Sequence, residues 1–374
     1  MAKSGANNLQ VRNTNIKRIV NLLYQTDGMT NLAIANALHL SMPTVSQIIK
    51  ELNARGLVRD AGTLASSGGR KPALNALAYD ARFSLGIELT RNHIRFVVVN
   101  LAGDALYYRR MHESFCSDEA YFQRLGALLE QFLSENHIDR QRLLGVGLAV
   151  PGIVQSSEGI LEYVPTLDVK GLPISSLTRH IAYPSRVENE AKLAGFAEIW
   201  RMGSLNDAVF LSVNKGVGGA VIINDKLYTG RHFRSGEFGH MTIVKDGKRC
   251  DCGKNGCLEA YCSTTELTQD DFADLDGFFA ELEKQNPLCV KRWDTYCDYL
   301  AAGINNIRMI FDTDVIIGGE IDRYLEKNLD TFVQRLRALN SFSDDTPYLH
   351  ISRYGGKASA IGAALLLVDE FLNS

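Results

Sequence analysis

Apolar residues recur at helical spacing in the first part of the chain. The stripe of the first predicted helix consists of Ile16, Ile19, Val20 and Leu23. A short second helix is predicted over 32–38 and a third over 44–52. Ser41 is a candidate cap for the third helix, and Pro43 suits its first turn. The third helix is predicted to stop at Gly56.

Two short runs, 57–60 and 73–78, follow and flank a loop of glycine, serine and basic residues. Three short helices and a hairpin with a basic tip are typical of a winged helix-turn-helix. The outward face of the third helix carries Thr44, Ser46, Gln47 and Lys50, and the wing tip carries Arg70 and Lys71. Such side chains can read base edges or meet phosphate, so we expect all six to contact DNA. The alternative is a small helical protein-interaction module.

Charge is unevenly divided along the chain. The whole chain carries −3, whereas residues 1–80 hold nine Lys or Arg and four Asp or Glu, a net of +5. The remainder therefore carries −8. A basic head on an acidic body indicates a polyanion as partner of the head alone.

From about residue 83 the pattern changes to alternating strands and helices. Apolar runs predict these elements at 83–89, 94–103, 119–136, 143–154, 209–224, 314–321 and 358–372. The alternation predicts an α/β fold, and two strand-rich blocks indicate two lobes with a cleft between them. We expect a head over 1–78, a first lobe over 79–188 and a second lobe over 189–357, with 358–374 packing back on the first lobe.

Composition indicates a soluble, globular chain of 374 residues, 45% hydrophobic and 22% charged. The chain shows no apolar run of transmembrane length, and its first ten residues lack the apolar core of a secretory signal. Seven is an odd number of cysteines, and three of them cluster with a histidine. These features predict a cytoplasmic protein with no membrane partner and with a metal site in place of disulfides.

The candidate metal ligands are His240, Cys250, Cys252 and Cys257, spaced as His-x9-Cys-x-Cys-x4-Cys. Thiolates and imidazole suit tetrahedral Zn²⁺, and four protein ligands leave no open position, so we expect structural zinc. Gly253 and Gly256 permit the loop to fold back on itself. The alternative is a loop of unligated cysteines. The other four cysteines, Cys116, Cys262, Cys289 and Cys297, are expected to be buried apolar residues.

Five further motifs are distinctive when taken together: 69-GRKP-72, 188-ENE-190, 237-EFGH-240, 250-CDCGKNGCLE-259 and 316-IIGGEI-321. With them the chain resembles the ROK family, named for repressors, open reading frames and sugar kinases. The resemblance covers nearly the whole chain, including the winged helix of the repressor branch. It implies a two-lobed actin/hexokinase-like fold after the head, and the same four metal ligands.

A sugar site is expected beside the metal loop. Glu237 and Glu259 flank this loop, so a metal that fixes the loop also fixes them. Carboxylates and imidazole that face a cleft are good partners for sugar hydroxyls. The resemblance implies that Glu237, His240 and Glu259 bind sugar, together with Asn189 and Glu190 at the family's Asn-Asp pair. Glutamate in place of that aspartate moves the charge outward by a methylene. The alternative for each carboxylate is a solvated surface position.

The phosphate-binding motif of the family's kinases is altered. These kinases carry Asp-x-Gly-Gly-Thr where this chain has 88-ELTRN-92, so side chains occupy space that backbone needs near phosphate. A second loop, 213-VNKGVGGA-220, has Asn214-Lys215 where kinases have Gly-Thr. Both departures indicate that ATP binding and catalysis are lost, so we expect no enzymatic activity.

The sequence therefore predicts a sugar-responsive repressor of carbohydrate-metabolism genes. Its partners would be operator DNA, a monosaccharide, amino-sugar or sugar-phosphate effector, and a second copy in a homodimer or tetramer. Two alternatives stay open: an active ROK sugar kinase with an added DNA-binding head, and a repressor controlled by a partner protein.

Overall fold

The head is a helical unit with a two-stranded wing. We describe the computed structural model over residues 2–63, 73–202, 207–269, 271–340, 342 and 348–373. The head comprises α1 (Ala2–Tyr24), α2 (Asn31–Leu38), α3 (Met42–Ala54), β1 (Val58–Thr63) and β2 (Ala73–Leu77). Thr30 caps α2, and Ser41 caps α3 by accepting from the backbone N–H of Thr44 at 3.3 Å. The predicted helical stripes are confirmed, because Ile19, Leu23 and their equivalents on α3 are buried.

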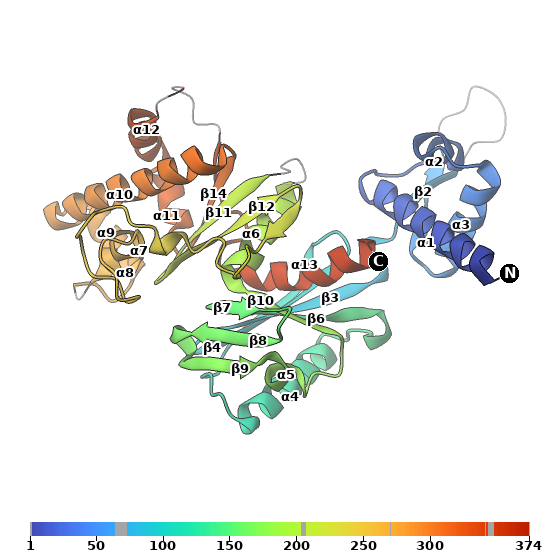
Figure 1. Cartoon of the computed structure of the whole chain (residues 1–374), viewed down its shortest axis with the longest axis horizontal. Coiled ribbons are helices and arrows are strands. Elements are labelled where there is room, and N and C mark those ends of the chain that lie inside the picture. The colour runs from blue at the N-terminus through green and yellow to red at the C-terminus, as the bar shows by residue number, and fades with distance from the viewer. Residues whose placement is uncertain are drawn as a thin grey trace.

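The first lobe is built on a mixed sheet in the order β10-β6-β3-β4-β5 (Figure 1). Its strands are β3 (Phe83–Leu89), β4 (His93–Asn100), β5 (Ala105–His112), β6 (Leu143–Val150) and β10 (Ser185–Asn189). β3, β4 and β5 pair antiparallel, whereas β6 runs parallel to both β3 and β10. Helix α4 (Glu119–Glu135) covers one face through Leu125 and Phe132. A smaller sheet of β7 (Ile153–Gln155), β8 (Ile160–Val164) and β9 (Val169–Pro173) adjoins, followed by α5 (Ile174–Thr178).

The second lobe is built on a sheet in the order β13-β12-β11-β14-β15. Its strands are β11 (Ala208–Val213), β12 (Val217–Ile223), β13 (Lys226–Tyr228), β14 (Asp314–Gly319) and β15 (Leu349–Ile351). The helices are α7 (Glu259–Cys262), α8 (Thr265–Thr268), α9 (Leu275–Glu283), α10 (Pro287–Phe311), α11 (Asp322–Lys327) and α12 (Leu329–Leu339). Short 3-10 turns η1 (Tyr79–Ala81), η2 (Arg140–Arg142), η3 (Pro165–Leu167), η4 (Phe238–His240) and η5 (Gly355–Lys357) join the elements.

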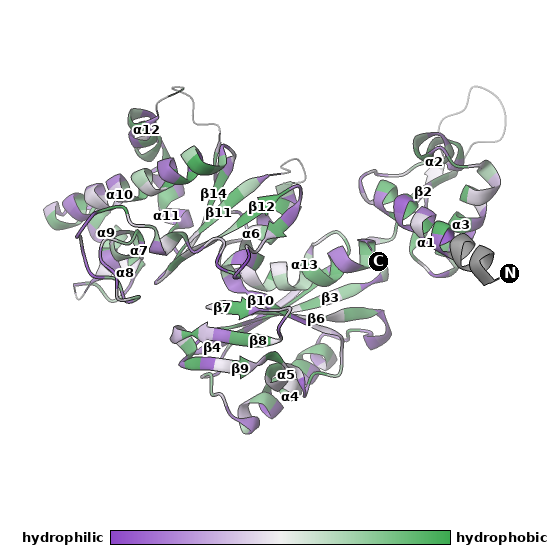
Figure 2. Cartoon of the chain, viewed as in Figure 1, coloured by the Kyte–Doolittle hydropathy of each residue, from purple (hydrophilic) through white to green (hydrophobic). Residues whose placement is uncertain are grey.

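Two helices at the centre tie the lobes together. α6 (Glu190–Met202) lies on β11 and β12, and α13 (Ala358–Asn373) lies on β3 and β6 and against α6. Hydropathy follows this arrangement, since most of α13 and the central strands are apolar (Figure 2). A Cβ on Gly362 would lie 1.9 Å from the Leu193 carbonyl oxygen, so glycine is what lets these two helices touch.

Several expectations from the sequence are corrected or fall outside the described residues. Cys116 is exposed rather than buried, because it lies in the loop before α4, where its thiol donates to the carboxylate of Asp118 at 3.0 Å. Arg70 and Lys71 lie outside the described residues.

Among the described residues, no single helix has the length and hydropathy of a membrane span, although α2 and α3 pass that test as a pair bent by 118°. The proposed domain boundaries stay predictions.

Candidate functional site

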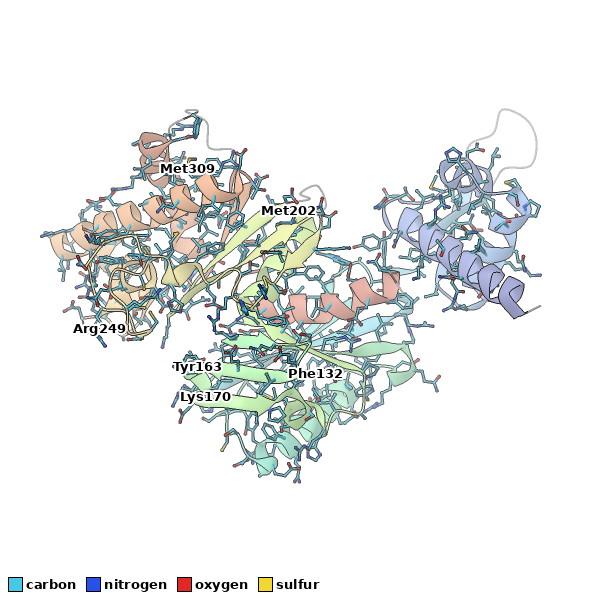
Figure 3. The ribbon with its side chains drawn as sticks, viewed as in Figure 1. Phe132, Tyr163, Lys170, Met202, Arg249 and Met309 are labelled. Atoms are coloured by element: carbon cyan, nitrogen blue, oxygen red, sulfur yellow. The ribbon has the colours of Figure 1, made fainter. Side chains whose placement is uncertain are left out.

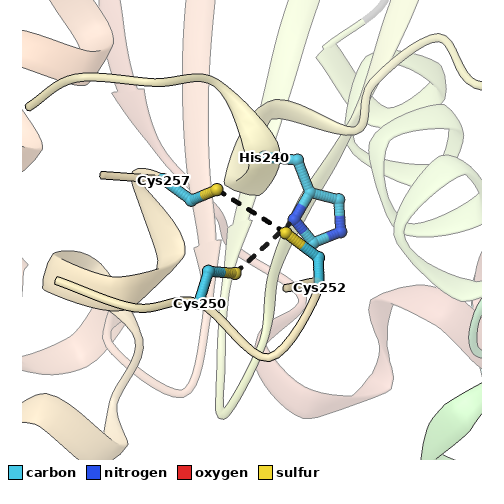
Figure 4. A group of neighbouring side chains, drawn as sticks. All are labelled: His240, Cys250, Cys252 and Cys257. Carbon is cyan, nitrogen blue, oxygen red and sulfur yellow. Dashed lines mark hydrogen bonds between the residues drawn. The ribbon is translucent and has the colours of Figure 1, made fainter. Parts of the chain in front are cut away.

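The four candidate metal ligands converge in the second lobe. Nδ1 of His240 and the three Sγ atoms all lie within 4.8 Å of one another (Figure 4). The Cys252 and Cys257 sulfurs are 3.7 Å apart, and the Cys250 sulfur is 3.9 Å from His240 Nδ1. A tetrahedral ion with bonds of about 2.3 Å to sulfur sets its ligands about 3.8 Å apart. The donor set and its spacing could therefore hold a metal ion.

Backbone geometry folds this loop before any metal is considered. The Cys250 N–H donates to the Lys254 carbonyl at 2.8 Å, and the Gly256 N–H donates to that of Lys248 at 2.8 Å. Gly256 has φ +81°, and a Cβ there would lie 1.7 Å from the Val244 carbonyl oxygen. The loop therefore requires glycine at 256 for both conformation and space.

Burial works against the charged form of two of these thiols. Burial raises the pKa of both Cys250 and Cys257, whereas the backbone N–H of Lys254 lowers the pKa of the exposed Cys252. A cation at the cluster would reverse the preference of the buried pair, because a coordinating thiol is deprotonated outright. The chemistry of the four donors thus suits Zn²⁺ better than an oxygen-seeking ion.

Glu237, His240 and Glu259 lie near one another beside the metal loop. Glu259 accepts from the backbone N–H of Val217 at 2.8 Å, and its other oxygen lies 3.7 Å from the Cys250 sulfur. Burial raises the pKa of Glu237 and Glu259 adds to it, whereas His240 and Lys192 oppose the shift. In Figure 4 the second ring nitrogen of His240 points away from the cysteines. The group could offer two carboxylates and an imidazole to one ligand.

Lys192, which sequence reasoning missed, lies close enough to Glu237 to oppose the rise in the pKa of that carboxyl. Its side chain is only 2% exposed. Its ammonium donates to the Phe233 carbonyl at 3.0 Å and lies 3.8 Å from a Glu188 oxygen. The four-residue spacing of Glu188 and Lys192 was the available signal, and the pair joins the end of β10 to the start of α6.

The side chains of Asn189 and Glu190 differ in whether they are already hydrogen-bonded within the described part of the chain. The Asn189 amide donates to the Gly152 carbonyl at 2.8 Å and accepts from the Lys192 N–H at 3.0 Å, so both ends of the side chain are engaged. Glu190 makes no hydrogen bond or ion pair within the described part of the chain. Burial, with Glu88 nearby, raises the pKa of Glu190 to about 8. A pKa raised in this direction favours the protonated carboxyl, which can donate a hydrogen bond.

Glu88 is paired with Arg95, a second residue that sequence reasoning missed. The two lie directly opposite on β3 and β4, and a guanidinium nitrogen is 2.6 Å from one Glu88 oxygen. The other Glu88 oxygen is buried and has no hydrogen-bond partner among the described residues. In the turn between the strands, Thr90 bonds both ways with the backbone of His93, and Arg91 donates to the Thr166 carbonyl at 3.0 Å. Hairpin register was the signal that could have found Arg95.

On α3, Ser46, Gln47 and Lys50 are exposed, whereas Thr44 is partly covered. The Thr44 hydroxyl lies 2.8 Å from that of Ser41, and the Asn31 amide lies 3.3 Å from the Ser46 hydroxyl. The outward face of α3 is thus available for a contact with another molecule. The hydroxyls of Thr44 and Ser46 are oriented by their contacts with Ser41 and Asn31.

A cavity of about 750 Å³ lies elsewhere, where the head meets both lobes. Tyr24 and Tyr79 line it from the head side, and Trp200 from the end of α6. None of the predicted sugar-binding residues lines this cavity. Tyr163 and Lys170, on the small sheet of the first lobe, do not line this cavity either, and Tyr163 is 52% exposed (Figure 3).

Fold and site define a two-lobed α/β protein of the sugar-kinase-like class that carries a winged-helix head. The ROK family model matches residues 84–370, and a winged helix-turn-helix DNA-binding model matches residues 12–59. The chain belongs to the ROK family.

Two xylose repressors among the curated relatives span nearly the full chain, and NagC spans about two thirds of it. This chain is 25% identical over 396 residues to a putative xylose repressor of Caldicellulosiruptor sp. (strain Rt8B.4), covering 98% of each chain. It is 24% identical to the xylose repressor of Bacillus subtilis (strain 168), covering 97% of each, and 25% identical to the DNA-binding transcriptional dual regulator NagC of Escherichia coli (strain K12), covering 69% of this chain and 64% of NagC.

Solved structures share the fold. A ROK family transcriptional regulator described as a homolog of the E. coli MLC protein superposes with a TM-score of 0.79 at 23% identity, covering 97% of this chain and 98% of that one. The ROK hexokinase of Thermus thermophilus gives 0.67 at 24% identity, covering 78% and 100%.

Proposed function

We propose that this protein is a sugar-responsive transcriptional repressor of carbohydrate-metabolism genes. One observation supports the proposal most: Glu88, which stands at the first position of the family's phosphate-binding motif, is paired with Arg95 at 2.6 Å. Glu237, His240 and Glu259 stand at the positions that the resemblance assigns to the sugar, with Glu190 in place of the family's aspartate. The full-length relatives named as repressors and the winged head support the DNA-binding half of the proposal.

Zinc is proposed as a structural clamp held by His240, Cys250, Cys252 and Cys257. All four positions are filled by the protein, so the ion supplies rigidity and no open site. Through this clamp, Glu237, His240 and Glu259 would be held toward the hydroxyls of a monosaccharide or amino sugar. Asn189 would position the Gly152 turn beside the ligand, and Glu190 would donate to it.

The DNA-binding half rests on the exposed face of α3. Ser46, Gln47 and Lys50, with Thr44, would enter a major groove, and Arg70 and Lys71 are proposed to reach the backbone or minor groove. A cytoplasmic homodimer would place two such heads on a palindromic site.

The test begins with ligand and operator. A thermal-shift screen against monosaccharides, amino sugars and their phosphates should give about 2–4 kcal/mol of stabilisation for a saturating hit, and Glu237→Ala should lose it. Operator fragments, selected from random DNA, are then titrated with and without that sugar. Operator affinity unchanged by every ligand in the panel would defeat the mechanism.

The rival from the enzyme class is an active sugar kinase. Kinase neighbours share the fold, so an ATP-dependent phosphorylation assay on the same sugar is the discriminating measurement. Product formation that disappears in Glu190→Ala would favour the kinase. Sugar binding without product favours the sensor.

A further inference from the structure

The cavity beside the head is a built site with two kinds of wall. One wall is aromatic: the Tyr24 ring lies 6.0 Å from Tyr79 and 5.7 Å from Trp200, edge to face in both cases. Its volume of about 750 Å³ lies in the range of small-molecule pockets, about 300–1,000 Å³. Rings of this kind present flat faces to a sugar or a base.

The other wall is cationic. Arg201, Arg353 and Lys357 line the cavity, whereas Asp104 is the one carboxylate among its described lining residues. Arg201 lies over the Tyr354 ring at 5.1 Å and Lys357 over the Tyr108 ring at 4.7 Å. None of the three cations has a carboxylate partner within 4.0 Å in the described segments. They leave an excess of two positive charges, which matches a dianion.

The cationic wall is held in place by a buried residue. Glu198, 1% exposed on α6, accepts from the Ser352 hydroxyl at 2.5 Å and from the Tyr354 N–H at 3.1 Å. It also accepts from the Arg353 N–H at 3.2 Å. The loop that carries Arg353 is therefore ordered before any ligand arrives, which lowers the cost of binding.

The walls come from three parts of the molecule. Tyr24 belongs to the head, Gly103 and Asp104 to the turn between β4 and β5, and Arg201 and Arg353 to elements that reach the second lobe. A ligand here would touch all three at once. It would thus favour one placement of the head, and by linkage it would change operator affinity.

We propose that this cavity is a second effector site, separate from the sugar cleft, which takes a ring-bearing phosphate monoester. Arg201 and Arg353 hold the phosphate with help from Lys357, since arginine forks match phosphate oxygens. The ring lies against Trp200 and the two tyrosines.

The experiment uses Trp200 as reporter. The chain holds two tryptophans, and the other, Trp293, is buried in the second-lobe core. Full-length protein is titrated with a hexose 6-phosphate, its parent hexose, a nucleoside monophosphate and inorganic phosphate, following intrinsic fluorescence and calorimetry. We expect a saturable change with a ring phosphate in both measurements. Trp200→Phe should abolish the fluorescence change and weaken the affinity seen by calorimetry, because this ring contacts the ligand.

Charge variants separate this site from the cleft. Arg201→Gln with Arg353→Gln should weaken phosphate-ester binding at least about tenfold. Arg337→Gln, an exposed cation on α12 without an ion pair among the described residues, should leave it unchanged. Glu237→Ala in the cleft should leave binding of the nucleoside monophosphate unchanged. Phosphate-ester binding lost in Glu237→Ala but kept in the double variant would overturn the proposal. So would the absence of saturable binding by either ring phosphate, or equal binding of inorganic phosphate.

Discussion

At the residue scale, the conformation of the metal loop depends on glycine at position 256, where a side chain would not fit. Gly256 and Gly253 both have positive φ, +81° and +90°. Only at Gly256 would a Cβ meet backbone, the Val244 oxygen at 1.7 Å, whereas nothing lies within 4 Å at Gly253. The two positions therefore separate conformational strain from collision.

Gly256→Ala should lower the free energy of unfolding by about 3 kcal/mol or more and reduce bound zinc, because the loop must open to admit the methyl group. Gly253→Ala should cost about 1 kcal/mol and keep its zinc. Urea melts and metal analysis of the purified proteins check both. Equal losses in the two variants would contradict a collision at Gly256.

Glu190 makes stability depend on pH. Its ordinary pKa of 4.5 is raised to about 8 in the folded chain by burial and by Glu88. Between these values the unfolded chain gives up the proton and the folded chain keeps it, so this contribution to stability is lost as pH rises toward 8. Glu190→Gln should therefore gain stability relative to the parent as pH rises, by up to about 5 kcal/mol above pH 8, and should lie close to it near pH 4.5.

Thermal melts across this pH range measure the difference. Glu158→Gln, which removes an exposed carboxylate in a turn, serves as control and should show no such trend. A Glu190→Gln difference that stays constant with pH would show that folding does not shift the pKa of this carboxyl.

At the scale of elements, the β3–β4 hairpin joins a buried acid to its counterion. Arg95→Met should lower the free energy of unfolding by about 3–5 kcal/mol, because Glu88 would stay buried and unpaired. The double variant Glu88→Gln with Arg95→Met should lose clearly less than the two single changes together. For comparison, the exposed Arg186–Glu370 pair, 51% and 46% exposed, should show coupling of about 0–1 kcal/mol. Additive losses at Glu88 and Arg95 would mean that the pair is not coupled.

Elements with strong local patterns could be predicted from the sequence. The stripes of α1 and α3, the apolar runs of β3 and β6 and the helix α13 are all confirmed, because their periodicity reflects which face is buried. The sequence left β5 and the long helix α10 unassigned. β5 is largely exposed on the sheet edge, and the polar residues of α10 interrupt its apolar stripe.

The candidate site divides in the same way. The four metal ligands come from one short segment and their convergence was readable from spacing, whereas Lys192 and Arg95 reach their partners through tertiary packing and strand register. The roles of the sugar- and DNA-contacting residues stay predictions.

At the scale of the whole molecule, head and cleft should be coupled in both directions. If sugar lowers operator affinity by some factor, saturating operator must lower sugar affinity by the same factor, about 5- to 150-fold in typical cases. Fluorescence anisotropy of labelled operator and calorimetry of the sugar give the two factors. Unequal factors at equilibrium would show that a further species takes part.

Removal of zinc should weaken the sugar response as well as the stability of the protein. Sugar affinity that survives complete loss of zinc would contradict the proposed dependence of the sugar site on the metal.

The contact of α13 with the first-lobe sheet sets an order of events during synthesis. A Cβ on Gly86 would lie 1.8 Å from the Ala360 oxygen, and one on Gly147 would lie 1.9 Å from that of Ala363, so this helix lies directly on the strands. The head leaves the ribosome first, but the sheet lacks its cover until residues 358–373 follow. Because Ile361 and Leu372 of this helix also belong to the core of the head, a chain that ends before residue 358 would leave both the first-lobe sheet and the head without part of their core.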